Sequence, residues 1–521
     1  MQRYVVITGG VMSGLGKGIT TSSIAKILQS MGFSVTAIKI DPYVNVDAGT
    51  MSPFEHGEVF VLEDGGEVDQ DLGNYERFLD VKLTREHNIT TGKVYQRAIE
   101  KERKGDYLGK TVQVIPHITD EIKGIIKSVS LPHDFSVIEV GGTVGDIESM
   151  PFLEAVRQLA LEEQVVFVHV TLVPVSDVVG EQKTKPTQHS VKELRQVGIS
   201  PTIIVCRSRK PLEEKIRGKI ALFCNVHEDR VISAYDMDDI YKVPLLLESE
   251  CIGGKILSQF GMKKKAKLEK WEKIISRHMK KEVRVALCGK YVHLGDSYIS
   301  IKEALKHASF LTGVKARMEL LDVETLDREE LSQYDGIIVP IGYGPRGAEG
   351  KIDAIRYSRE NGVPFLGLCF GMQLAVVEYA RTILGLEKAN STEIDPKTPH
   401  PVIDLLPEQQ HISHLGGTMR LGAYEAVIVR NTLAHRLYKK KSIFERHRHR
   451  WEVNPAYVKR LEEGGLLFSA RSPNGVVMET LELPTHPFFL ATQFHPEYTS
   501  RLENPSPPFV GFVQAMGKKK G

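Results

Sequence analysis

A cysteine flanked by glycines is the residue of this chain that is best placed for covalent chemistry. Cys369 lies in Gly367-Leu-Cys-Phe-Gly371, just after the apolar run Val363–Leu366. Gly-x-Cys-x-Gly between an expected strand and an expected helix is typical of a nucleophile elbow, a sharp turn that exposes a side chain above a helix N-terminus. The pattern therefore predicts that Cys369 acts as a nucleophile.

A histidine and a glutamate that could activate this cysteine follow much later in the chain. Phe494-His-Pro-Glu497 supplies His495 as a base and Glu497 as the carboxylate that orients it. A free thiol needs such help because it is mostly protonated at neutral pH. These residues resemble the triad of class I glutamine amidotransferases, which release ammonia from glutamine, so we expect an acceptor for ammonia elsewhere in the chain.

A second chemical site is expected near the N-terminus, where the strand-like run Tyr4–Thr8 leads into Gly9-Gly-Val-Met-Ser-Gly-Leu-Gly-Lys-Gly-Ile-Thr20. Such a loop lets backbone N–H groups surround phosphates at a helix N-terminus, with Lys17 reaching the outer phosphates. It departs from the common G-x-x-x-x-G-K-[ST] pattern, because Val11 takes the first position and Gly18 follows the lysine. Thr20 or Thr21 could supply the missing hydroxyl; the alternative is a plain glycine turn before a helix.

Two acidic residues are candidates to hold the magnesium ion that a phosphate loop requires. Asp71 lies in Glu67-Val-Asp-Gln-Asp-Leu-Gly73, and Glu139 lies at the end of the strand-like run Phe135–Val140. A carboxylate at the carboxyl end of a parallel strand faces the ligand crevice of such a sheet. The alternative, a surface acid in a loop, is stronger for Asp71 than for Glu139.

The order of expected elements predicts two α/β domains joined by a helix. Residues 1–262 alternate β-branched runs with helical segments, which predicts a doubly wound parallel sheet. Residues 263–282 carry Leu268, Trp271, Ile275 and Met279 at helical spacing among lysines, which favours a linker helix over a membrane-binding or partner-binding helix. Residues 283–521 again alternate strands and helices and end in a lysine-rich tail, Gly517–Gly521.

Length and composition limit the class of protein. A chain of 521 residues predicts two or more domains, and 41% hydrophobic with 26% charged residues is an ordinary globular composition. The formal net charge of +2 gives no reason to expect a nucleic-acid or membrane partner, and neither a membrane span nor a signal peptide is recognisable. The five cysteines lack any CxxC pair, which predicts reduced thiols in the cytoplasm and neither disulfides nor zinc.

Over nearly its whole length the chain resembles the CTP synthase family, glutamine-dependent amidoligases that convert UTP to CTP. The resemblance implies a P-loop sheet of the dethiobiotin synthetase type, followed by a flavodoxin-like class I glutamine amidotransferase domain. It rests on several long segments in a fixed order, among them Lys39-Ile-Asp-Pro-Tyr-Val-Asn-Val-Asp47, Gly49-Thr-Met-Ser-Pro53, His56-Gly-Glu-Val-Phe60, Gly141-Gly-Thr-Val-Gly-Asp-Ile-Glu148, Lys183-Thr-Lys-Pro-Thr-Gln188, Asn390-Ser-Thr-Glu393 and Glu445-Arg-His-Arg-His-Arg450.

The resemblance implies roles for residues of the first domain. Lys39 would steady the transferring phosphoryl group, Asp71 and Glu139 would hold Mg²⁺, and Leu108-Gly109 would belong to a lid near the uracil. ATP would contact Gly14, Leu15, Gly16, Lys17, Gly18, Ile19, Asp71, Tyr235, Asp236 and Met237, with Tyr235 replacing a more usual lysine. UTP, or inhibitory CTP, would contact Ser13, Asp146, Ile147, Glu148, Lys183, Thr184, Lys185, Pro186, Thr187, Gln188 and Lys219.

In the second domain the resemblance implies a glutamine site around the triad Cys369, His495 and Glu497. Arg450 and Glu393 fit this role on their own chemistry, since the carboxylate of glutamine needs a cation and its ammonium needs an acid. The glutamine-binding positions are Gly342, Phe370, Gly371, Met372, Gln373, Glu393 and Arg450. Activation by GTP, inhibition by CTP and a homotetramer with nucleotide sites at subunit contacts come only from the resemblance.

The implied mechanism joins the two sites. ATP would phosphorylate O4 of UTP, and ammonia released at Cys369 would travel internally to carbon 4 and displace phosphate. Transit must avoid bulk water, where ammonia becomes ammonium and loses its nucleophilic lone pair.

Three positions of the second domain depart from the family's usual residues. Ile341 interrupts the glycine pair before the glutamine loop, Ile299 replaces a common lysine, and Trp451 replaces a common tyrosine. A β-branched residue resists positive φ, so we expect the turn at Ile341 to be shaped differently around its oxyanion-binding N–H groups. The hypothesis is that glutaminase activity survives, weakened or coupled differently to GTP.

Two other interpretations predict different sequences. A cobyrinate or cobyrate amidating enzyme would act on carboxylates and should lack the segments 39–60 and 183–188, which are present. A regulatory or filament-forming ATPase with a vestigial glutaminase should have lost part of the triad or Glu139, and these too are present.

Overall fold

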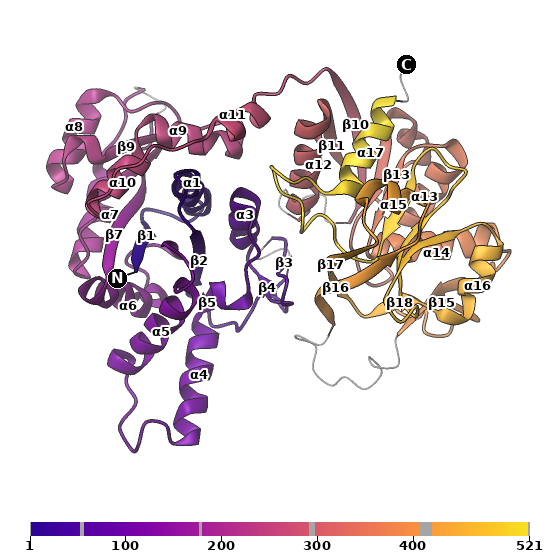
Figure 1. Ribbon diagram of the computed structural model, residues 1–521, viewed down its shortest axis with the longest axis horizontal. Helices are drawn as coiled ribbons and strands as arrows, with labels where there is room; N and C mark the ends of the chain where they lie inside the picture. Colours follow the sequence, from indigo (N-terminus) through magenta and orange to yellow (C-terminus); the bar gives the residue numbers. More distant parts are fainter. Residues whose placement is uncertain (1, 53–56, 177–179, 291–296, 406–418, 519–521) are drawn as a thin grey trace. The chain divides into compact units, whose positions relative to one another are not determined.

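The computed structural model describes residues 2–52, 57–176, 180–290, 297–405 and 419–518. The chain forms two units: Met1–Ala48 with Gln70–Ile275, and Gly49–Asp69 with Ser276–Gly521 (Figure 1). Pro53 and His56 of the quoted family segments and the last three residues of the predicted tail lie outside the described residues.

The first unit is built on a seven-stranded sheet with the order β5-β2-β6-β1-β7-β8-β9. Each neighbouring pair is parallel, which confirms the predicted doubly wound α/β fold. The β-branched runs form strands because both faces of the sheet are covered by helices, so every side chain of β2 and β6 is buried. The strands are β1 Arg3–Gly9, β2 Val35–Asp41, β5 Asn88–Thr90, β6 Phe135–Val140, β7 Gln164–Leu172, β8 Ile203–Ser208 and β9 Val231–Tyr235.

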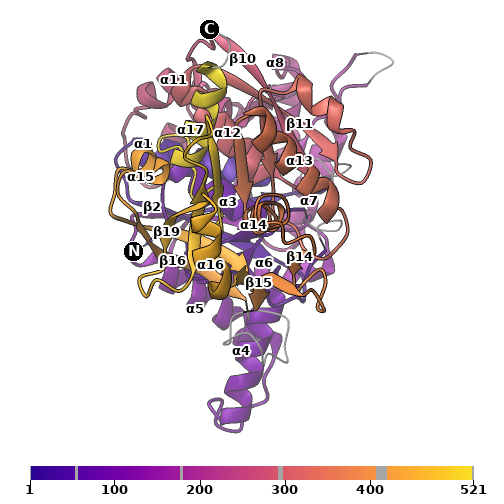
Figure 2. The same ribbon diagram turned by 90° about the vertical axis from the view of Figure 1, so that its right-hand side faces the viewer.

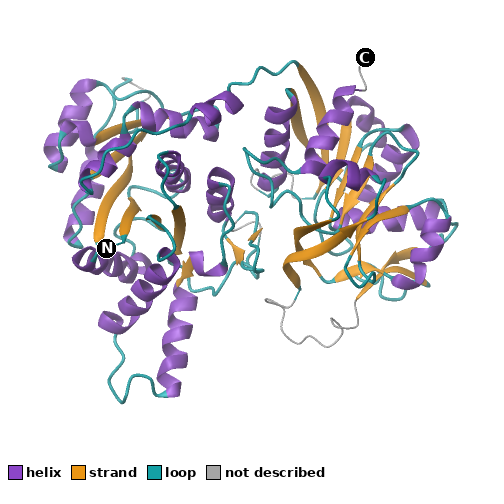
Figure 3. Cartoon of the chain, in the orientation of Figure 1, coloured by secondary structure: helices purple, strands orange, loops and turns teal. Residues whose placement is uncertain are grey.

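Helices follow the strands and cover both faces of this sheet (Figure 3). In α5 the apolar residues Ile122, Ile125 and Ile126 are buried on one side, while Lys123 and Lys127 pair with Glu162 on the other. The helix α4 and the loop after it project away from the sheet (Figure 2). The helices are α1 Lys17–Ser30, α3 Gln70–Leu79, α4 Thr91–Lys104, α5 Thr119–Ser130, α6 Met150–Glu162, α7 Lys185–Gln196, α8 Glu214–Cys224, α9 Val243–Ser249, α10 Ile252–Gln259 and α11 Glu269–Ile275.

The helix at the predicted linker is shorter than the sequence suggested. It covers Glu269–Ile275 rather than 263–282, and its buried residues are Trp271 and Ile275. The Trp271 indole N–H donates to the Tyr241 carbonyl at 2.7 Å, and its ring packs against Phe78. Because Leu268, Trp271 and Ile275 are buried within the chain, the stripe serves intramolecular packing.

The second unit contains a nine-stranded sheet with the order β11-β10-β12-β13-β21-β20-β19-β16-β17. Its first five strands are parallel and the rest pair antiparallel. The strands are β10 Lys281–Gly289, β11 Val314–Asp322, β12 Gly336–Val339, β13 Phe365–Leu368, β16 Arg420–Ile428, β17 Ser442–His449, β19 Leu467–Arg471, β20 Met478–Glu482 and β21 Phe489–Thr492.

Helices pack on both faces of this sheet as well, with α12 against α17 on one face and α13 against α14 on the other. The helices are α12 Ile299–Thr312, α13 Ala348–Asn361, α14 Phe370–Thr382, α15 Leu433–Tyr438, α16 Pro455–Glu463 and α17 Pro507–Lys518. Smaller sheets join β14 Ala389–Ser391, β15 His400–Leu405 and β18 Trp451–Val453, and β3 Phe60–Val61 with β4 Glu67–Val68.

The segment 49–69 packs with residues that are far away in sequence. The Ala423 N–H donates to the Glu63 carbonyl at 2.9 Å, and the Tyr498 hydroxyl donates to the Val59 carbonyl at 3.2 Å. Phe60 contacts the Tyr498 ring edge-on. The predicted domain boundary at residue 262 assigns this segment to the first domain, and that boundary stays a prediction.

The helices of the described ranges include none that combines the length and the apolar character needed to cross a membrane.

Candidate active sites

Cys369 lies between β13 and α14, at the carboxyl end of a central parallel strand. Its backbone has φ 53° and ψ −100°, a conformation that is strained for a residue with a side chain. The Cys369 N–H donates to the Thr492 carbonyl of β21 at 2.7 Å, and the Cys369 carbonyl accepts from the Met372 N–H at 2.9 Å. The elbow is therefore held from both sides while the thiol lies at the N-terminus of α14.

The two glycines of the motif are required by close packing rather than by positive φ. A Cβ on Gly371 would lie 2.1 Å from the Val339 carbonyl oxygen, and one on Gly367 would lie 2.9 Å from the Cβ of Ala491. Neither glycine has positive φ; the cysteine itself takes the unusual conformation. The sequence pattern thus located the elbow, and the structure adds that the strained backbone conformation is that of Cys369 itself.

His495 and Glu497 lie fully buried beside the thiol. The His495 Nδ1 is 2.7 Å from a Glu497 carboxylate oxygen, while its Nε2 is buried without a hydrogen-bond partner among the described residues. Burial alone would lower the pKa of His495, but the charges of Glu497 and Cys369 raise it to about 10. This arrangement favours a protonated imidazole that stabilises a thiolate at Cys369.

A cavity of about 540 Å³ opens in front of Cys369 within the second unit. It brings together the predicted glutamine-binding residues Gly342, Phe370, Gln373, Glu393 and Arg450. Gly371 and Met372 are instead buried in α14 behind the cavity. The Glu393 carboxylate accepts from the Gly344 N–H at 2.9 Å, and burial raises the pKa of Glu393 while Lys290 lowers it.

The turn at Ile341 accommodates the β-branched side chain. Ile341 is not among the described residues with positive φ, and its side chain packs against a hydrophobic cluster. Lys351 of α13 is buried below the turn, and its Nζ donates to the carbonyls of Pro340 at 3.2 Å and Ile341 at 3.3 Å. Burial and Lys290 lower the pKa of Lys351 to about 7, although the nearby cysteines raise it. The turn is thus shaped from below by a lysine that the sequence did not point out.

Trp451 and Ile299 occupy different surroundings. Trp451 lines the cavity, and its indole N–H donates to the Thr392 hydroxyl at 3.2 Å. Ile299 is the first residue of α12 and is half-buried, next to cavity-lining Tyr298.

In the first unit, the glycine-rich segment forms a loop that ends at the N-terminus of α1. Gly14 and Gly16 have φ of 73° and 83°, and Val11 takes φ 84° despite its β-branched side chain. The Lys17 Nζ donates to the Gly142 carbonyl at 2.5 Å, and burial lowers the Lys17 pKa although Glu139 raises it. Ser13 is exposed and Ile19 half-buried. The loop has the backbone that a phosphate site needs, with Val11 as a strained position.

Lys39 is the centre of a buried charge cluster behind the loop. Its Nζ forms a short contact with Asp71 and lies 3.4 Å from Glu139 and 3.5 Å from Asp41. Burial and the charge of Asp71 raise the pKa of Glu139 to about 7, while Lys39, Tyr75 and Lys17 lower it. A Cβ on Gly18 would lie 2.0 Å from an Asp71 oxygen, so this glycine lets the carboxylate approach the helix N-terminus. Both predicted magnesium-binding residues therefore lie together.

A cavity of about 320 Å³ lies at the other side of the loop and gathers Gly14, Leu15 and Asp236. Arg207, at the end of β8, also lines it and donates to the Asp236 carboxylate at 2.8 Å and to the Tyr235 carbonyl at 3.3 Å. Tyr235 and Met237, on either side of Asp236 in the sequence, are both half-buried. Arg207 was missed from the sequence, although a charged residue ending a buried strand was a usable signal.

The predicted UTP- or CTP-binding residues are not all available to a ligand. Thr184 and Thr187 are buried, and the Thr187 hydroxyl donates to the Leu172 carbonyl at 3.1 Å, so they shape the start of α7. Lys185 and Lys219 are exposed, Pro186 and Gln188 half-buried, and Lys183 pairs with Glu181 at 2.7 Å. Asp146 accepts from the Thr143 N–H at 2.7 Å, whereas Ile147 and Glu148 are exposed. Leu108 of the implied lid is exposed and has φ 52°.

Comparisons with known proteins cover nearly the whole chain. Residues 3–262 match the family described as CTP synthase N-terminus, and residues 293–515 match glutamine amidotransferase class-I. The chain is 59% identical over 530 residues to the CTP synthases of Thermococcus gammatolerans and Pyrococcus furiosus, covering 100% of this chain and 99% of each relative. The CTP synthase of Archaeoglobus fulgidus is 57% identical over 99% of this chain and 98% of its own length.

A solved structure described as Trypanosoma brucei CTPS glutaminase domain with bound acivicin is 36% identical, with a TM-score of 0.44, and covers 46% of this chain and 95% of its own.

Proposed function

The chain belongs to the CTP synthase family, and from this premise we propose that it aminates UTP to CTP, using ATP and ammonia from glutamine. One observation carries the proposal. A single chain holds both an elbow cysteine with a buried His–Glu pair and a lysine–carboxylate cluster behind a phosphate loop. Such a combination suits an enzyme that releases ammonia and activates its acceptor by phosphorylation.

Glutamine hydrolysis is assigned to the second unit. The Cys369 thiolate attacks the amide carbon of glutamine, and backbone N–H groups near the Ile341 turn stabilise the oxyanion. The His495 imidazolium gives its proton to the departing amide nitrogen, which leaves as ammonia, and a thioester remains. Neutral His495 then takes a proton from water, which attacks the thioester carbonyl and releases glutamate and the thiolate. Glu497 keeps the imidazole oriented throughout.

Phosphoryl transfer is assigned to the first unit. O4 of UTP attacks the γ-phosphorus of ATP, the bond to the β-phosphate oxygen breaks, and ADP leaves, while N3 of the uracil ring releases its proton. Lys17 and Lys39 balance the negative charge of the transferring group. Ammonia then attacks carbon 4, gives up a proton, and displaces phosphate to form CTP.

Asp71 and Glu139 are the residues that would hold Mg²⁺. Their oxygen atoms are the donors that this hard cation prefers, and burial, followed by the negative charge of Asp71, raises the pKa of Glu139. Among the described residues no set of three or more possible ligands gathers, which fits an ion that takes its remaining ligands from phosphates and water. When bound, Mg²⁺ would neutralise charge on the phosphates.

Further parts of the proposal rest on the family resemblance. We propose that GTP activates and CTP inhibits the enzyme, that the inhibitory site overlaps the UTP residues assigned above, and that it works as a cytoplasmic homotetramer. The five cysteines are all free, which supports a reducing compartment.

Steady-state CTP formation with either ammonium or glutamine tests the proposal. Lys17→Ala should abolish synthesis from both nitrogen sources, whereas Lys459→Ala, which changes an exposed lysine, should not. Cys369→Ala should abolish glutamine use and leave ammonium use largely intact, with Cys251→Ala as a control at an exposed free thiol.

The outcomes separate the parts of the proposal. No CTP from ammonium would overturn the assigned synthase function. Synthesis from ammonium but not from glutamine in the unmodified protein would overturn the hypothesis that the glutaminase tolerates Ile341.

A further inference from the structure

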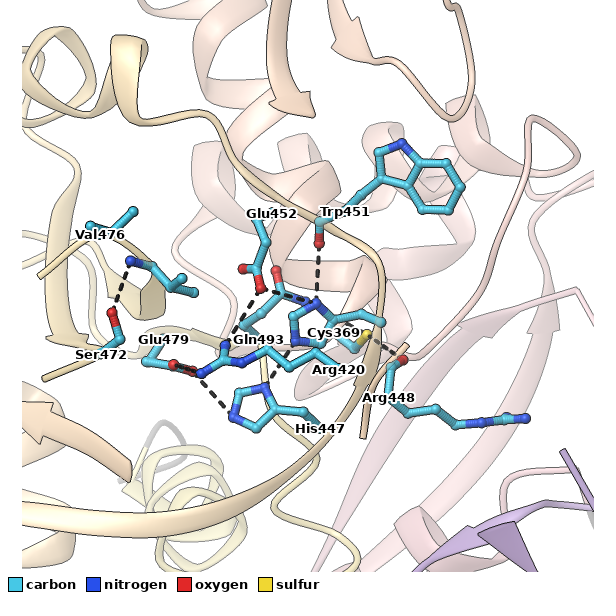
Figure 4. Close-up of polar contacts among 12 residues, drawn as sticks. Cys369, Arg420, His447, Arg448, Trp451, Glu452, Ser472, Val476, Glu479 and Gln493 are labelled. Atoms are coloured by element: carbon cyan, nitrogen blue, oxygen red, sulfur yellow. Dashed lines mark hydrogen bonds and ion pairs between the residues drawn. The ribbon is translucent and has the colours of Figure 1, made fainter. Parts of the chain in front are cut away.

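Five ionisable side chains form a buried cluster behind Cys369 in the second unit (Figure 4). His447 and His449 come from β17, and Arg420, Glu452 and Glu479 from β16, β18 and β20. His447 and Glu479 are 0% exposed and Glu452 is 1% exposed. Burying ionisable groups is costly unless they are mutually paired. The triad mechanism uses none of them, so their presence calls for another role.

The partners of these side chains define a directional chain of hydrogen bonds. The His449 Nδ1 lies 3.2 Å from the Trp451 carbonyl oxygen, which can only accept, so this nitrogen carries a hydrogen. The other His449 nitrogen, Nε2, lies 2.9 Å from the His447 Nδ1. Burial and Arg420 lower the pKa of both histidines, so both rings are neutral. His449 Nε2 therefore accepts, and His447 Nδ1 donates.

This assignment requires one more proton at the other end of the hydrogen-bond chain, between His447 and Glu479. The His447 Nε2 would then be an acceptor, and it faces a Glu479 carboxylate oxygen at 3.3 Å. Neither atom has a hydrogen-bond partner among the residues that the structure describes. Two lone pairs would oppose each other unless a proton lies between them, and burial raises the pKa of Glu479. The other Glu479 oxygen accepts from Arg420 at 2.8 Å.

The hydrogen-bond chain ends at the Trp451 carbonyl, and the Arg448 carbonyl lies on the backbone between its two histidines; both carbonyls contact residues of the glutamine site. The Trp451 carbonyl, which accepts from His449, also accepts from the Gln373 side chain at 2.8 Å. The Arg448 carbonyl, on the backbone between the two histidines, accepts from Cys369 at 3.8 Å while the cysteine is protonated, before the thiolate forms. Gln493 connects these two residues, because its side-chain amide accepts from Gln373 at 3.4 Å and donates to the Cys369 sulfur at 3.7 Å.

Side chains of β17 alternate between its two faces, so the position of the two histidines also sets the position of the residues on the other face. His447 and His449 point into the cluster, so Arg446 and Arg448 point the opposite way. Arg446 donates to the Val61 carbonyl at 3.0 Å, and Arg448 donates to Glu67 at 2.8 Å. Fixing the two imidazoles thus fixes the register of the strand that leads directly to cavity-lining Arg450.

We infer that Glu479, His447 and His449 are positioning residues of the glutaminase, which lock β17 so that the Arg448 and Trp451 carbonyls hold Cys369 and Gln373. The inference rests on the glutaminase function proposed above. It assigns a role to the two histidines of the Arg-His-Arg-His-Arg run, of which the glutamine chemistry uses only Arg450.

Substitutions at Glu479 test the inference through rescue by a conservative variant. Glu479→Gln can accept from Arg420 with its oxygen and donate to His447 with its nitrogen, so the chain stays complete without a shared proton. Glu479→Leu leaves the His447 Nε2 without its facing group and leaves Arg420 with only one of its two carboxylate partners among the described residues, Glu452. We expect Glu479→Leu to lower kcat/KM for glutamine by about 10-fold or more, as small misplacements at a reacting centre do, and Glu479→Gln to stay within about 3-fold.

Glu482→Leu is the matched control. Glu482 is also a buried carboxylate of β20, but it accepts from the Leu433 and Ala434 N–H groups at 2.8 and 3.1 Å, outside the cluster. Its substitution should lower stability while leaving glutamine use near normal. His449→Phe is a second breaking variant that keeps a ring of similar shape; by releasing the Trp451 carbonyl, it should raise KM for glutamine by about 10-fold.

All variants should keep ammonium-dependent synthesis. Equal losses of glutamine use in Glu479→Gln and Glu479→Leu would overturn the inference. It would also be overturned by equal losses in Glu482→Leu and Glu479→Leu, or by normal glutamine use in both Glu479→Leu and His449→Phe. An unmodified protein that makes CTP from ammonium but not from glutamine would instead overturn the glutaminase function.

Discussion

His495 and Glu497 in the second unit are fully buried and lie 2.7 Å apart, whereas Lys183 in the first unit is half exposed and pairs with exposed Glu181. In the proposed mechanism the first pair raises the reactivity of a thiol, and its geometry is fixed before glutamine arrives. A nucleoside triphosphate brings its own charges, so the lysines proposed to bind it need only be within reach. The buried Lys39 cluster combines features of both. Carboxylates hold its lysine in place, as in the His495–Glu497 pair, and the cluster also faces a phosphate loop.

The largest expected effect comes from Lys39→Met. The variant leaves Asp71, Glu139 and Asp41 without their shared cation, and both their repulsion and the loss of charge balance oppose phosphoryl transfer. We expect CTP formation from either nitrogen source to fall about 10³-fold, in line with the removal of a transition-state charge partner. Glutamine hydrolysis, measured as glutamate release, should continue. A loss confined to glutamine use would contradict the assignment of Lys39.

Glu497→Gln tests how much the glutaminase depends on its fixed pair. Without the carboxylate, the pKa of His495 falls and the imidazole loses its orientation, so glutamine-dependent kcat should drop about 10²-fold, with ammonium use unchanged. An equal loss with ammonium would separate Glu497 from the triad.

The same variant should change the dependence of stability on pH. His495 has a raised pKa of about 10 against 6.5 for the ordinary group, so its contribution is fully present below pH 6.5 and is lost as the pH rises towards 10. The unmodified second unit should therefore lose stability between pH 7 and 10, and Glu497→Gln should lose less. Urea unfolding followed by Trp451 fluorescence, with both proteins carrying Trp271→Phe, measures this difference. Parallel curves would contradict the ion pair.

Gly371→Ala tests the packing of the elbow. The new Cβ would lie 2.1 Å from the Val339 carbonyl, so backbone must move, and the free energy of unfolding should fall by about 2 kcal/mol, as overpacking typically costs. Glutamine use should fall with it. Gly124→Ala in α5, where a Cβ meets nothing within 4 Å, should instead stabilise by about 0.5–1 kcal/mol. Equal effects of the two substitutions on urea unfolding would show that the crowding at Gly371 is relieved.

Features that depend on local pattern were predictable from the sequence. The apolar runs became buried parallel strands because both faces of each sheet are covered, and the spacing around Cys369 located the elbow. His495 and Glu497 are two residues apart, so their contact required no knowledge of the fold. The site assignments as a whole remain proposals.

Features that depend on distant parts of the chain were not predictable from local pattern. Lys351 and Gln493 act through neighbours on other elements. The His–His chain requires strand alternation and the approach of Glu479 from β20. The packing of 49–69 depends on backbone contacts such as Ala423 to Glu63, which leave no trace in side-chain pattern.

The smallest expected effect comes from substitution of the exposed Lys183. Lys183 and Glu181 are 48% and 52% exposed in their side chains, and such pairs contribute little to stability because water and salt screen them. Lys183→Met should therefore leave the unfolding midpoint unchanged, yet raise KM for UTP by about 10-fold, the cost of one hydrogen bond to a charged phosphate. Glu181→Gln frees Lys183 for the ligand, so KM for UTP should stay constant or fall slightly. Steady-state kinetics with saturating ATP and ammonium measure both, and a rise in KM for Glu181→Gln would mean that the pair itself, and not the lysine alone, forms the UTP site.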